Sequence, residues 1–345
     1  MSIRRKFQIK RRLFLAIVGS SMAASVSTQQ ANADVSKNKL VVYTHRNEQL
    51  IKPLFDAYKI FTGVEVEFLS GEPGPLFERI KAEGVNSPAD LFISVDAGSL
   101  WQADKEGLFA KTDSKLLNEH IPAYLRADDG TWYGLSLRAR TIFYNKEKVK
   151  PSELKDYADL ASPKWKGRLC LRTSKKVYNQ SLVAMMIAQL GEKETERIVS
   201  GWVNNLATDV FDNDTKLLEA IDKGVCQVGL ANTYYYGRLE KDKKVKNVGV
   251  YFPPATHVNV SGGGVLKNSK HKAEAVRLLE WLTTPKAQKM FADSNMEYPV
   301  VPNVDPDPLV KAWGMPKAST TPLAKAGELQ RSAVMLMDKV KYRKS

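Results

Sequence analysis

Three consecutive tyrosines, Tyr234, Tyr235 and Tyr236, are the side chains of this sequence whose type and spacing best suit metal chemistry. They follow an apolar run at residues 228–231 and a helix-start signal at residues 232–233. A phenol with an ordinary pKa of about 10 ionises at neutral pH only beside a strong cation. Ferric iron is such a cation, whereas Mg²⁺ and Ca²⁺ are better matched by carboxylates and carbonyls. The cluster therefore favours a trivalent metal ion.

Packing is the alternative explanation for these tyrosines, because aromatic side chains where a strand meets a helix usually fill a core or its rim. Three of the histidines, His120, His257 and His271, lack ligand spacing to one another, and we expect surface or helix-capping roles for them. The residues alone therefore leave metal binding and packing both open.

The first 33 residues have the pattern of a cleaved export signal. Six basic residues precede a short apolar stretch at 13–18, and a small-x-small site at 31–33 makes Asp34 the expected first mature residue. Arg11 and Arg12 are similar to the twin-arginine export motif, with an ordinary secretory signal as the alternative, and both predict a periplasmic location. The apolar stretch is shorter than the ~20 residues of a membrane span, so we predict no transmembrane anchor.

Composition indicates a soluble globular protein, with 345 residues, 43% hydrophobic and 26% charged. Loss of the leader lowers the formal net charge by six, from +14 to +8. The basic residues are dispersed and are not interleaved with a base-stacking aromatic motif, so we predict no nucleic-acid partner. The sequence contains no Gly-x-Ser-x-Gly, His-Glu-x-x-His or P-loop motif, which argues against an enzyme.

The two cysteines, Cys170 and Cys226, both fall in β-like runs. An exported protein meets an oxidising compartment, so a structural disulfide is favoured over two free buried thiols. Neither cysteine has neighbours at metal-ligand spacing.

Strand and helix patterns alternate from residue 39 onward, with apolar strands near 40–43, 64–69 and 89–94. This βαβαβ order predicts a largely parallel sheet that binds ligands beyond the carboxyl ends of its strands, near residues 44–48 and 95–98. A second α/β lobe is expected from about 139 to 260. The glycine triplet at 262–264 is expected to act as a hinge or a tight turn. Two lobes joined by crossing strands would form a cleft that closes on a ligand.

Over nearly its whole mature length the chain resembles the ferric-iron substrate-binding proteins of ABC importers, a branch of the type II periplasmic binding fold. The matching segments are Val-Tyr-Thr-His-Arg at 42–46, Pro-Ala-Asp-Leu at 88–91, Leu-Arg-Ala-Arg at 137–140, Val-Tyr-Asn at 177–179 and Ala-Asn-Thr-Tyr-Tyr-Tyr-Gly-Arg at 231–238. The resemblance implies a two-lobed α/β fold with a hinge. The first lobe is expected at 34–138, the second at 139–260, and a return to the first lobe with C-terminal helices at 261–345.

The resemblance also implies that Tyr178, Tyr234 and Tyr235 ligate Fe(III) from the second lobe, while Tyr236 turns into the core. Consecutive helical side chains diverge by about 100°, so two neighbours can hold one ion while the third points away. Family members with a first-lobe histidine place it just after the first strand, where this chain has Asn47 followed by a glutamate.

The first-lobe ligand is therefore open, with Glu48 and His45 as candidates. Some family members use a glutamate after the third strand, and this chain has Val95 followed by Asp96 there. The pattern is similar to a tyrosine-dominated subgroup that completes the metal coordination with carbonate, another small anion or water.

Charge balance supports such an anion, because three phenolates already neutralise Fe(III) and arginines would then hold a further anion. Candidate arginines are Arg46, Arg138, Arg140 and Arg238, of which Arg140 and Arg238 are favoured by their place in the family pattern; a surface ion pair is the alternative for each. The implied partner is an ABC permease at the inner membrane, served by a monomeric receptor. The rival functions are a receptor for a polyamine or an oxyanion, and a secreted enzyme.

Overall fold

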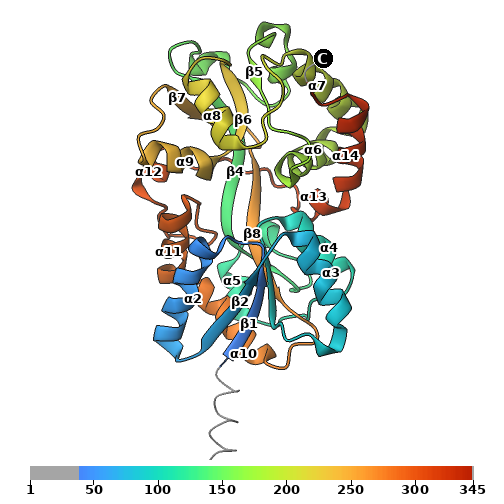
Figure 1. Cartoon of the computed structure of the whole chain (residues 1–345), viewed down its shortest axis with the longest axis vertical. Helices are drawn as coiled ribbons and strands as arrows, with labels where there is room; N and C mark the ends of the chain where they lie inside the picture. The colour runs from blue at the N-terminus through green and yellow to red at the C-terminus, as the bar shows by residue number, and fades with distance from the viewer. Residues whose placement is uncertain (1–38, 344–345) are drawn as a thin grey trace, which may run out of the picture.

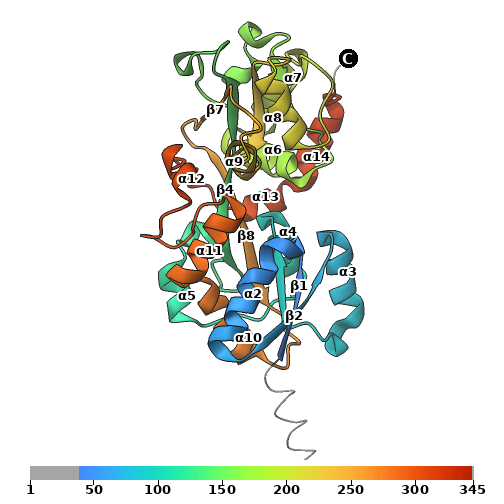
Figure 2. The same cartoon turned by 60° about the vertical axis from the view of Figure 1, so that its left-hand side comes forward.

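The computed structural model describes residues 39–343, so the predicted export signal and its cleavage site lie outside the described residues. Two lobes stand one above the other, and the strands β4 (Tyr133–Asn145) and β8 (His257–Val265) run side by side between them (Figure 1). Helices flank the strands in each lobe (Figure 2). The predicted two-lobed α/β architecture is therefore confirmed.

The first lobe is built on three parallel strands in the order that the sequence pattern predicts. It contains β1 (Lys39–Thr44), β2 (Glu65–Ser70), β3 (Leu91–Ser94), α2 (Glu48–Thr62), α3 (Pro73–Glu83), α4 (Ala97–Lys105), α5 (Lys115–His120), α10 (Lys272–Leu282) and α11 (Pro285–Asn295). In α2 the apolar side chains recur every three or four residues and are buried: Ile51, Leu54, Phe55 and Tyr58. Gly63 ends the helix in a left-handed conformation with a φ of 75°, as its position predicts.

The second lobe contains β5 (Leu169–Cys170), α6 (Val177–Leu190), α7 (Glu192–Asn204), α8 (Asp214–Asp222), β6 (Val228–Asn232), α9 (Thr233–Lys241) and β7 (Val248–Tyr251). Short 3₁₀ turns occur at Gly84–Asn86, Ala123–Leu125, Pro151–Glu153, Asp159–Ala161 and Pro163–Trp165. In this lobe Cys170 and Cys226 form a disulfide, with their Cα atoms 5.8 Å apart. The bond ties β5 to the segment that precedes β6.

All eight strands belong to one sheet, in the order β2-β1-β3-β8-β4-β6-β5, with β7 paired to β4. The pairs β1–β2, β1–β3 and β5–β6 are parallel, but β8 and β4 pair antiparallel with each other and with β3 and β6 respectively. The prediction of a largely parallel sheet is thus correct for β1 to β3 and wrong for the centre. The centre is antiparallel because β4 leaves the first lobe and β8 returns to it.

Each lobe has its own hydrophobic core, and the crossing strand β4 contributes residues to both. On β4, Ala139 belongs to the hydrophobic cluster of the first lobe, and Ile142 belongs to a cluster of the second lobe. On β8, Val258 and Val260 already pack in the first lobe. The lobe limits expected at residues 138 and 260 stay a prediction.

The glycine triplet lies inside β8 in extended conformation, so the expectation of a tight turn is wrong. The alternative expectation of a hinge stays a prediction. Gly262, Gly263 and Gly264 pair with β3, and none has a positive φ. A Cβ at Gly264 would lie 2.5 Å from the carbonyl oxygen of Thr131, and one at Gly262 would lie 2.6 Å from that of Tyr133. The glycines therefore permit close approach of neighbouring backbones.

The C-terminal helices cross between the lobes a third time. They are α12 (Pro308–Ala312), α13 (Ala324–Glu328) and α14 (Gln330–Lys339). Helix α13 contacts both α4 and α6, while α14 lies beside α6 in the second lobe (Figures 1 and 2). Ala333, Leu336 and Met337 of α14 share a cluster with Leu182 of α6. The last described helix therefore lies on the second lobe.

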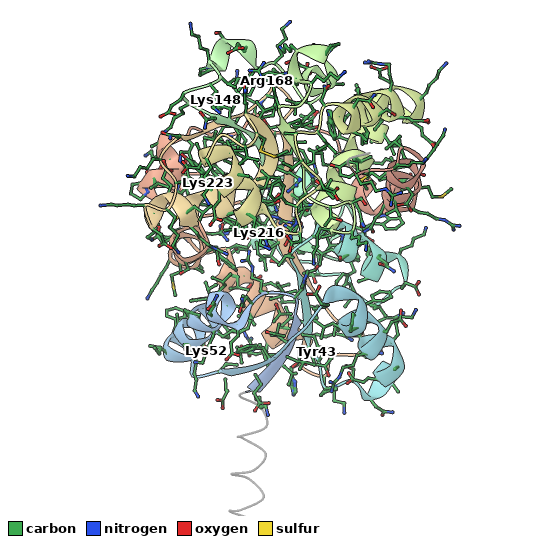
Figure 3. All side chains as sticks on the ribbon, turned by 45° about the horizontal axis from the view of Figure 1, so that its top comes forward. Tyr43, Lys52, Lys148, Arg168, Lys216 and Lys223 are labelled. Atoms are coloured by element: carbon green, nitrogen blue, oxygen red, sulfur yellow. A yellow bond between two sulfur atoms is a disulfide. The ribbon has the colours of Figure 1, made fainter. Side chains whose placement is uncertain are left out.

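Basic side chains are spread over both lobes, as the sequence predicts. Figure 3 places Lys52 on the first lobe and Lys148, Arg168, Lys216 and Lys223 on the second. Across residues 39–343, no helix is both long enough and apolar enough to cross a membrane.

We predict that replacing both cysteines by alanine (Cys170→Ala, Cys226→Ala) lowers the free energy of unfolding by about 4 kcal/mol. The disulfide closes a loop of 56 residues, and a cross-link of that span restricts the unfolded chain by roughly this amount. Urea unfolding followed by circular dichroism measures the change, with reduced wild-type protein as the control. A loss below about 1 kcal/mol would contradict this estimate.

Candidate metal centre

Three of the predicted tyrosines converge on one cavity at the junction of the lobes. Tyr178 is the second residue of α6, and Tyr234 and Tyr235 are the second and third residues of α9. The cavity measures about 180 Å³ and is lined by His45, Arg46, Asn47, Leu50, Val95, Arg138, Tyr178, Tyr234, Tyr235, Arg238 and Glu297. The ring centres of Tyr234 and Tyr235 lie 4.4 Å apart, and all three phenols line the cavity. Phenol oxygens from two helices are thus brought together.

Helix geometry separates the three consecutive tyrosines. Strand β6 ends at Asn232, which is the N-cap of α9, so the tyrosines occupy the first turn of the helix. Tyr236 turns away from the cavity and is 4% exposed. Its hydroxyl donates to Glu240 at 2.8 Å and to the Val248 carbonyl oxygen at 3.0 Å. The predicted packing role of Tyr236 is confirmed.

Burial favours the protonated state of Tyr178 and Tyr234 when no cation is present. Burial raises the pKa of Tyr178, and the charge of Tyr235 raises it further, whereas the Arg138 guanidinium opposes the rise. Burial also raises the pKa of Tyr234 well above its ordinary value, and the neighbouring tyrosines add to that rise. Ionising these groups therefore requires a ligand with a high positive charge.

Guanidinium groups surround the tyrosine rings. Arg138 lies 5.5 Å and Arg172 5.3 Å from the ring centre of Tyr178, and Arg238 lies 5.2 Å from that of Tyr234. One buried nitrogen each of Arg138 and Arg172 has no hydrogen-bond partner among the described residues. Such positive charge stabilises phenolates and can also hold an anion beside them.

Arg46 faces the tyrosines from the first lobe. Its Nη2 donates to Ser136 and Ser261 at 2.7 Å and to Glu297 at 2.5 Å. Ser136 donates to the same Glu297 oxygen, at 2.6 Å. The Nε of Arg46 is buried and has no partner within residues 39–343. One carboxylate thus holds the arginine in place.

Arg140 does not line the cavity, so direct contact between this residue and a bound anion is not supported. Its Nε donates to Asn179, its Nη1 to Asp214 and Asn232, and its Nη2 to the Leu230 carbonyl oxygen, at 2.9–3.1 Å. Asn179 lies in the first turn of α6, and Asn232 caps α9. Arg140 therefore fixes the starts of the two helices that carry the tyrosines.

Two buried charges behind the tyrosines were not found from the sequence. Arg172 lies over the rings of Tyr178 and Tyr235, and its Nη1 is 3.5 Å from the Asp214 carboxylate that also binds Arg140. Glu297, a lining residue, was also missed. No sequence motif signals Arg172, Asp214 or Glu297, because the residue that each one contacts lies far away in the chain.

The first-lobe candidates differ in position. His45 lines the cavity, with its Nε2 3.5 Å from a carboxylate oxygen of Glu72. Burial lowers the pKa of His45 to about 4, so its imidazole is neutral at neutral pH and can donate a lone pair. Glu48 is the exposed first residue of α2 and does not line the cavity. Asp96 is the N-cap of α4 and accepts from Ser99 instead.

The fold and the site define a class of protein. Solute receptors have this architecture, in which crossing strands join two α/β lobes and a polar cavity lies between them. Residues 54–317 match the family described as bacterial extracellular solute-binding protein. The chain belongs to that family, whose type II periplasmic binding fold the structure shows. The family is one of solute-binding proteins.

Within the family the chain is similar to iron-uptake proteins. It is 39% identical to iron uptake protein A1 of Synechocystis, over 97% of this chain and 99% of the relative. It is 29% identical to the Fe(3+)-binding periplasmic protein of Serratia marcescens, over 83% and 85% of the two chains. The structure of Trichodesmium FutA with iron and citrate has 43% identity and a TM-score of 0.84, over 88% of this chain and 99% of that one.

His257 contradicts the expectation of a surface or capping role, because it is buried on β8 at the lobe junction. Burial lowers its pKa to about 3, and the charges of Arg138 and Arg140 add to this effect. Its Nε2 lies 3.3 Å from the Ser181 hydroxyl, and its Nδ1 has no partner in the described chain. His271, in contrast, is the N-cap of α10, and His120 lies in the last turn of α5.

We predict that this buried histidine makes stability fall with acidification. Below pH ~6.5 the unfolded chain binds a proton on His257 that the folded protein excludes. The free energy of unfolding therefore falls by roughly 1.4 kcal/mol per pH unit until about pH 3. When the pH falls from 7 to 5, the free energy of unfolding of the wild type should therefore decrease by roughly 2 kcal/mol more than that of His257→Gln. Urea unfolding of both proteins at the two pH values measures the difference, and parallel pH dependence would refute it.

Proposed function

We propose that this protein is an extracytoplasmic receptor that captures Fe(III) through Tyr178, Tyr234 and Tyr235 and delivers it to an ABC permease. The observation that carries the proposal is the convergence of these three phenols on one cavity that also faces the first lobe. Oxygen donors that become anionic on binding suit a hard trivalent ion. The similarity to iron-binding relatives supports the same solute.

Capture begins at the second lobe, which supplies all three phenols. The ion displaces their protons, and three phenolates balance its charge. Arg46, Arg138 and Arg238, against the single carboxylate of Glu297, then leave an excess of positive charge, which a carbonate or another small anion can balance while it completes the coordination, with water as the alternative.

Closure brings the first lobe over the ion, and His45 is its best-placed additional ligand because it lines the cavity. Release to the permease requires the lobes to open again. Reduction to Fe(II), which phenolates bind less well, or proton uptake would assist release. The receptor is proposed to act as a monomer in the periplasm, exported by the twin-arginine or the general secretory route.

The cavity fits the rival solutes poorly. A polyamine would require carboxylates, but among the described residues Glu297 is the single acidic one in the lining, and it already pairs with Arg46. An oxyanion would use the arginines, yet it would leave three buried phenols without a role. Both rivals therefore explain only part of the lining.

We predict that Tyr234→Phe with Tyr235→Phe abolishes high-affinity Fe(III) binding, weakening it by at least about a thousandfold, on the order of 4 kcal/mol. The rings and their packing remain, so the loss would report the missing oxygens. Titration with ferric citrate, followed by the visible phenolate-to-iron charge-transfer band and by competition with excess citrate, measures the affinity.

The matched control is Tyr236→Phe, which alters the neighbouring tyrosine but no cavity oxygen and should keep both the colour and the affinity. Circular dichroism and thermal unfolding establish that each variant is folded. A folded double variant that retains the band and tight binding would disprove the ligand assignment. A wild type that stays colourless with bicarbonate supplied would disprove the function.

A further inference from the structure

Residues 296–314 connect the end of α11 in the first lobe to α9, the helix that carries Tyr234 and Tyr235, and we call this segment the strap. Near its start Tyr298 exchanges two backbone hydrogen bonds of 2.8 Å with Leu137 of β4. Farther along, α12 packs beside α9 (Figure 1). The strap is therefore attached to a crossing strand at one end and to the tyrosine helix at the other.

Trp313 makes the polar contact between the strap and α9. Its indole N–H donates to one carboxylate oxygen of Glu240 at 2.8 Å, and the other oxygen accepts from the Tyr236 hydroxyl at 2.8 Å. The ring centres of Trp313 and Tyr236 lie 5.0 Å apart. Trp313 also packs against two hydrophobic clusters, one that contains Tyr234 and one that contains Tyr236. The indole thus contacts α9 through both hydrogen bonding and packing.

Gly237 allows the strap to approach α9 closely. Met296, the first residue of the strap, is 2% exposed and ends α11 in a left-handed conformation with a φ of 56°. A Cβ at Gly237 would lie 2.7 Å from the Met296 Cβ and 3.0 Å from the Trp313 ring. Gly237 directly follows the three tyrosines in the chain. The distance between strap and helix is therefore set one residue away from the tyrosines.

We propose that the strap, through Trp313, positions the first turn of α9 and thereby the oxygens of Tyr234 and Tyr235. The role rests on the proposed function, because these oxygens are the proposed Fe(III) ligands. Helix α9 has nine residues, and its backbone hydrogen bonds make it move nearly as a unit, so a displacement at the strap also moves its first turn. The strap carries Glu297 as well, which holds Arg46 in the cavity lining. One segment therefore positions cavity groups of both lobes.

Two substitutions in this contact test the role. Trp313→Phe keeps a ring but removes the donor to Glu240, and Gly237→Ala adds a methyl group that would meet Met296. We expect each variant to bind Fe(III) about tenfold more weakly and to shift the phenolate-to-iron charge-transfer band, since this band depends on the iron–oxygen geometry. Titration with ferric citrate measures both, and circular dichroism establishes folding. Wild-type affinity and an unshifted band in both variants would overturn the proposal.

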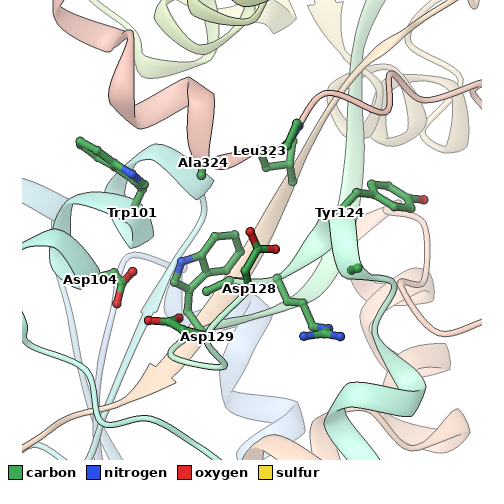
Figure 4. A pocket seen from close by; sticks show the side chains of 12 residues that line it. Trp101, Asp104, Tyr124, Asp128, Asp129, Leu323 and Ala324 are labelled. Carbon is green, nitrogen blue, oxygen red and sulfur yellow. The ribbon is translucent and has the colours of Figure 1, made fainter.

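Two matched controls separate positioning from general destabilisation. Gly201→Ala on α7 adds a methyl group that would lie 2.5 Å from the Ala161 Cβ, in a contact that does not involve α9. Trp101→Phe changes a tryptophan of α4, which borders a first-lobe cavity of about 440 Å³ that shares no lining residue with the tyrosine cavity (Figure 4). Both controls should keep the wild-type affinity and band. A band shift in the controls as large as in Trp313→Phe would refute the positioning role.

Hydrogen exchange of the iron-free protein tests the same contact without the metal. Trp313→Phe should raise the exchange rate of backbone amides in α9 by about threefold or more, while those of α6 exchange as in the wild type. Unchanged exchange in α9 would refute the positioning role whether or not the wild type binds iron. Faster exchange in α9, together with a wild type that binds no Fe(III), would support the role of the strap and refute the iron function.

Discussion

Charge balance inside a small, mostly buried space is the constraint on which the rest of this structure depends. Phenols in such a space stay protonated until a strong cation arrives, because burial penalises the phenolate. Buried arginines lower that penalty, but they would repel the same cation if their own charge were not balanced. Asp214 offsets this charge from behind, through ion pairs with Arg140 and Arg172, and Glu297 offsets the charge of Arg46 within the cavity lining. The site is thus neutral enough to fold and still able to select a highly charged ion.

The same network connects the site to the fold. Arg140 lies on β4, the strand that leaves the first lobe, and its contacts fix the starts of α6 and α9. Asn259 on the returning strand β8 donates to Asp96 in the first lobe and to Ser181 on α6. Both crossing strands therefore carry polar side chains that set the position of the tyrosine helices relative to the first lobe. The same contacts therefore fix both the arrangement of the lobes and the geometry of the candidate ligand site.

Local patterns were sufficient to predict much of this. The helical spacing of Ile51 and Leu54, the stop at Gly63 and the start of α9 all follow from the behaviour of short segments. The parallel strands β1 to β3 follow from alternation along the chain. The antiparallel centre of the sheet and the extended glycine triplet could not be predicted, because they depend on which strands pair across more than a hundred residues.

The sequence by itself determined which chemical groups are available to the site, since phenol oxygens and guanidinium groups keep their properties in any fold. It also determined that Tyr236 would diverge from its neighbours, because helix geometry is local. Only the tertiary structure decided that Arg140 and Arg172 support the site from behind, and that His45 and Glu297, rather than Glu48, reach the cavity. These outcomes depend on long-range packing, which brings together residues whose separation along the chain carries no signal.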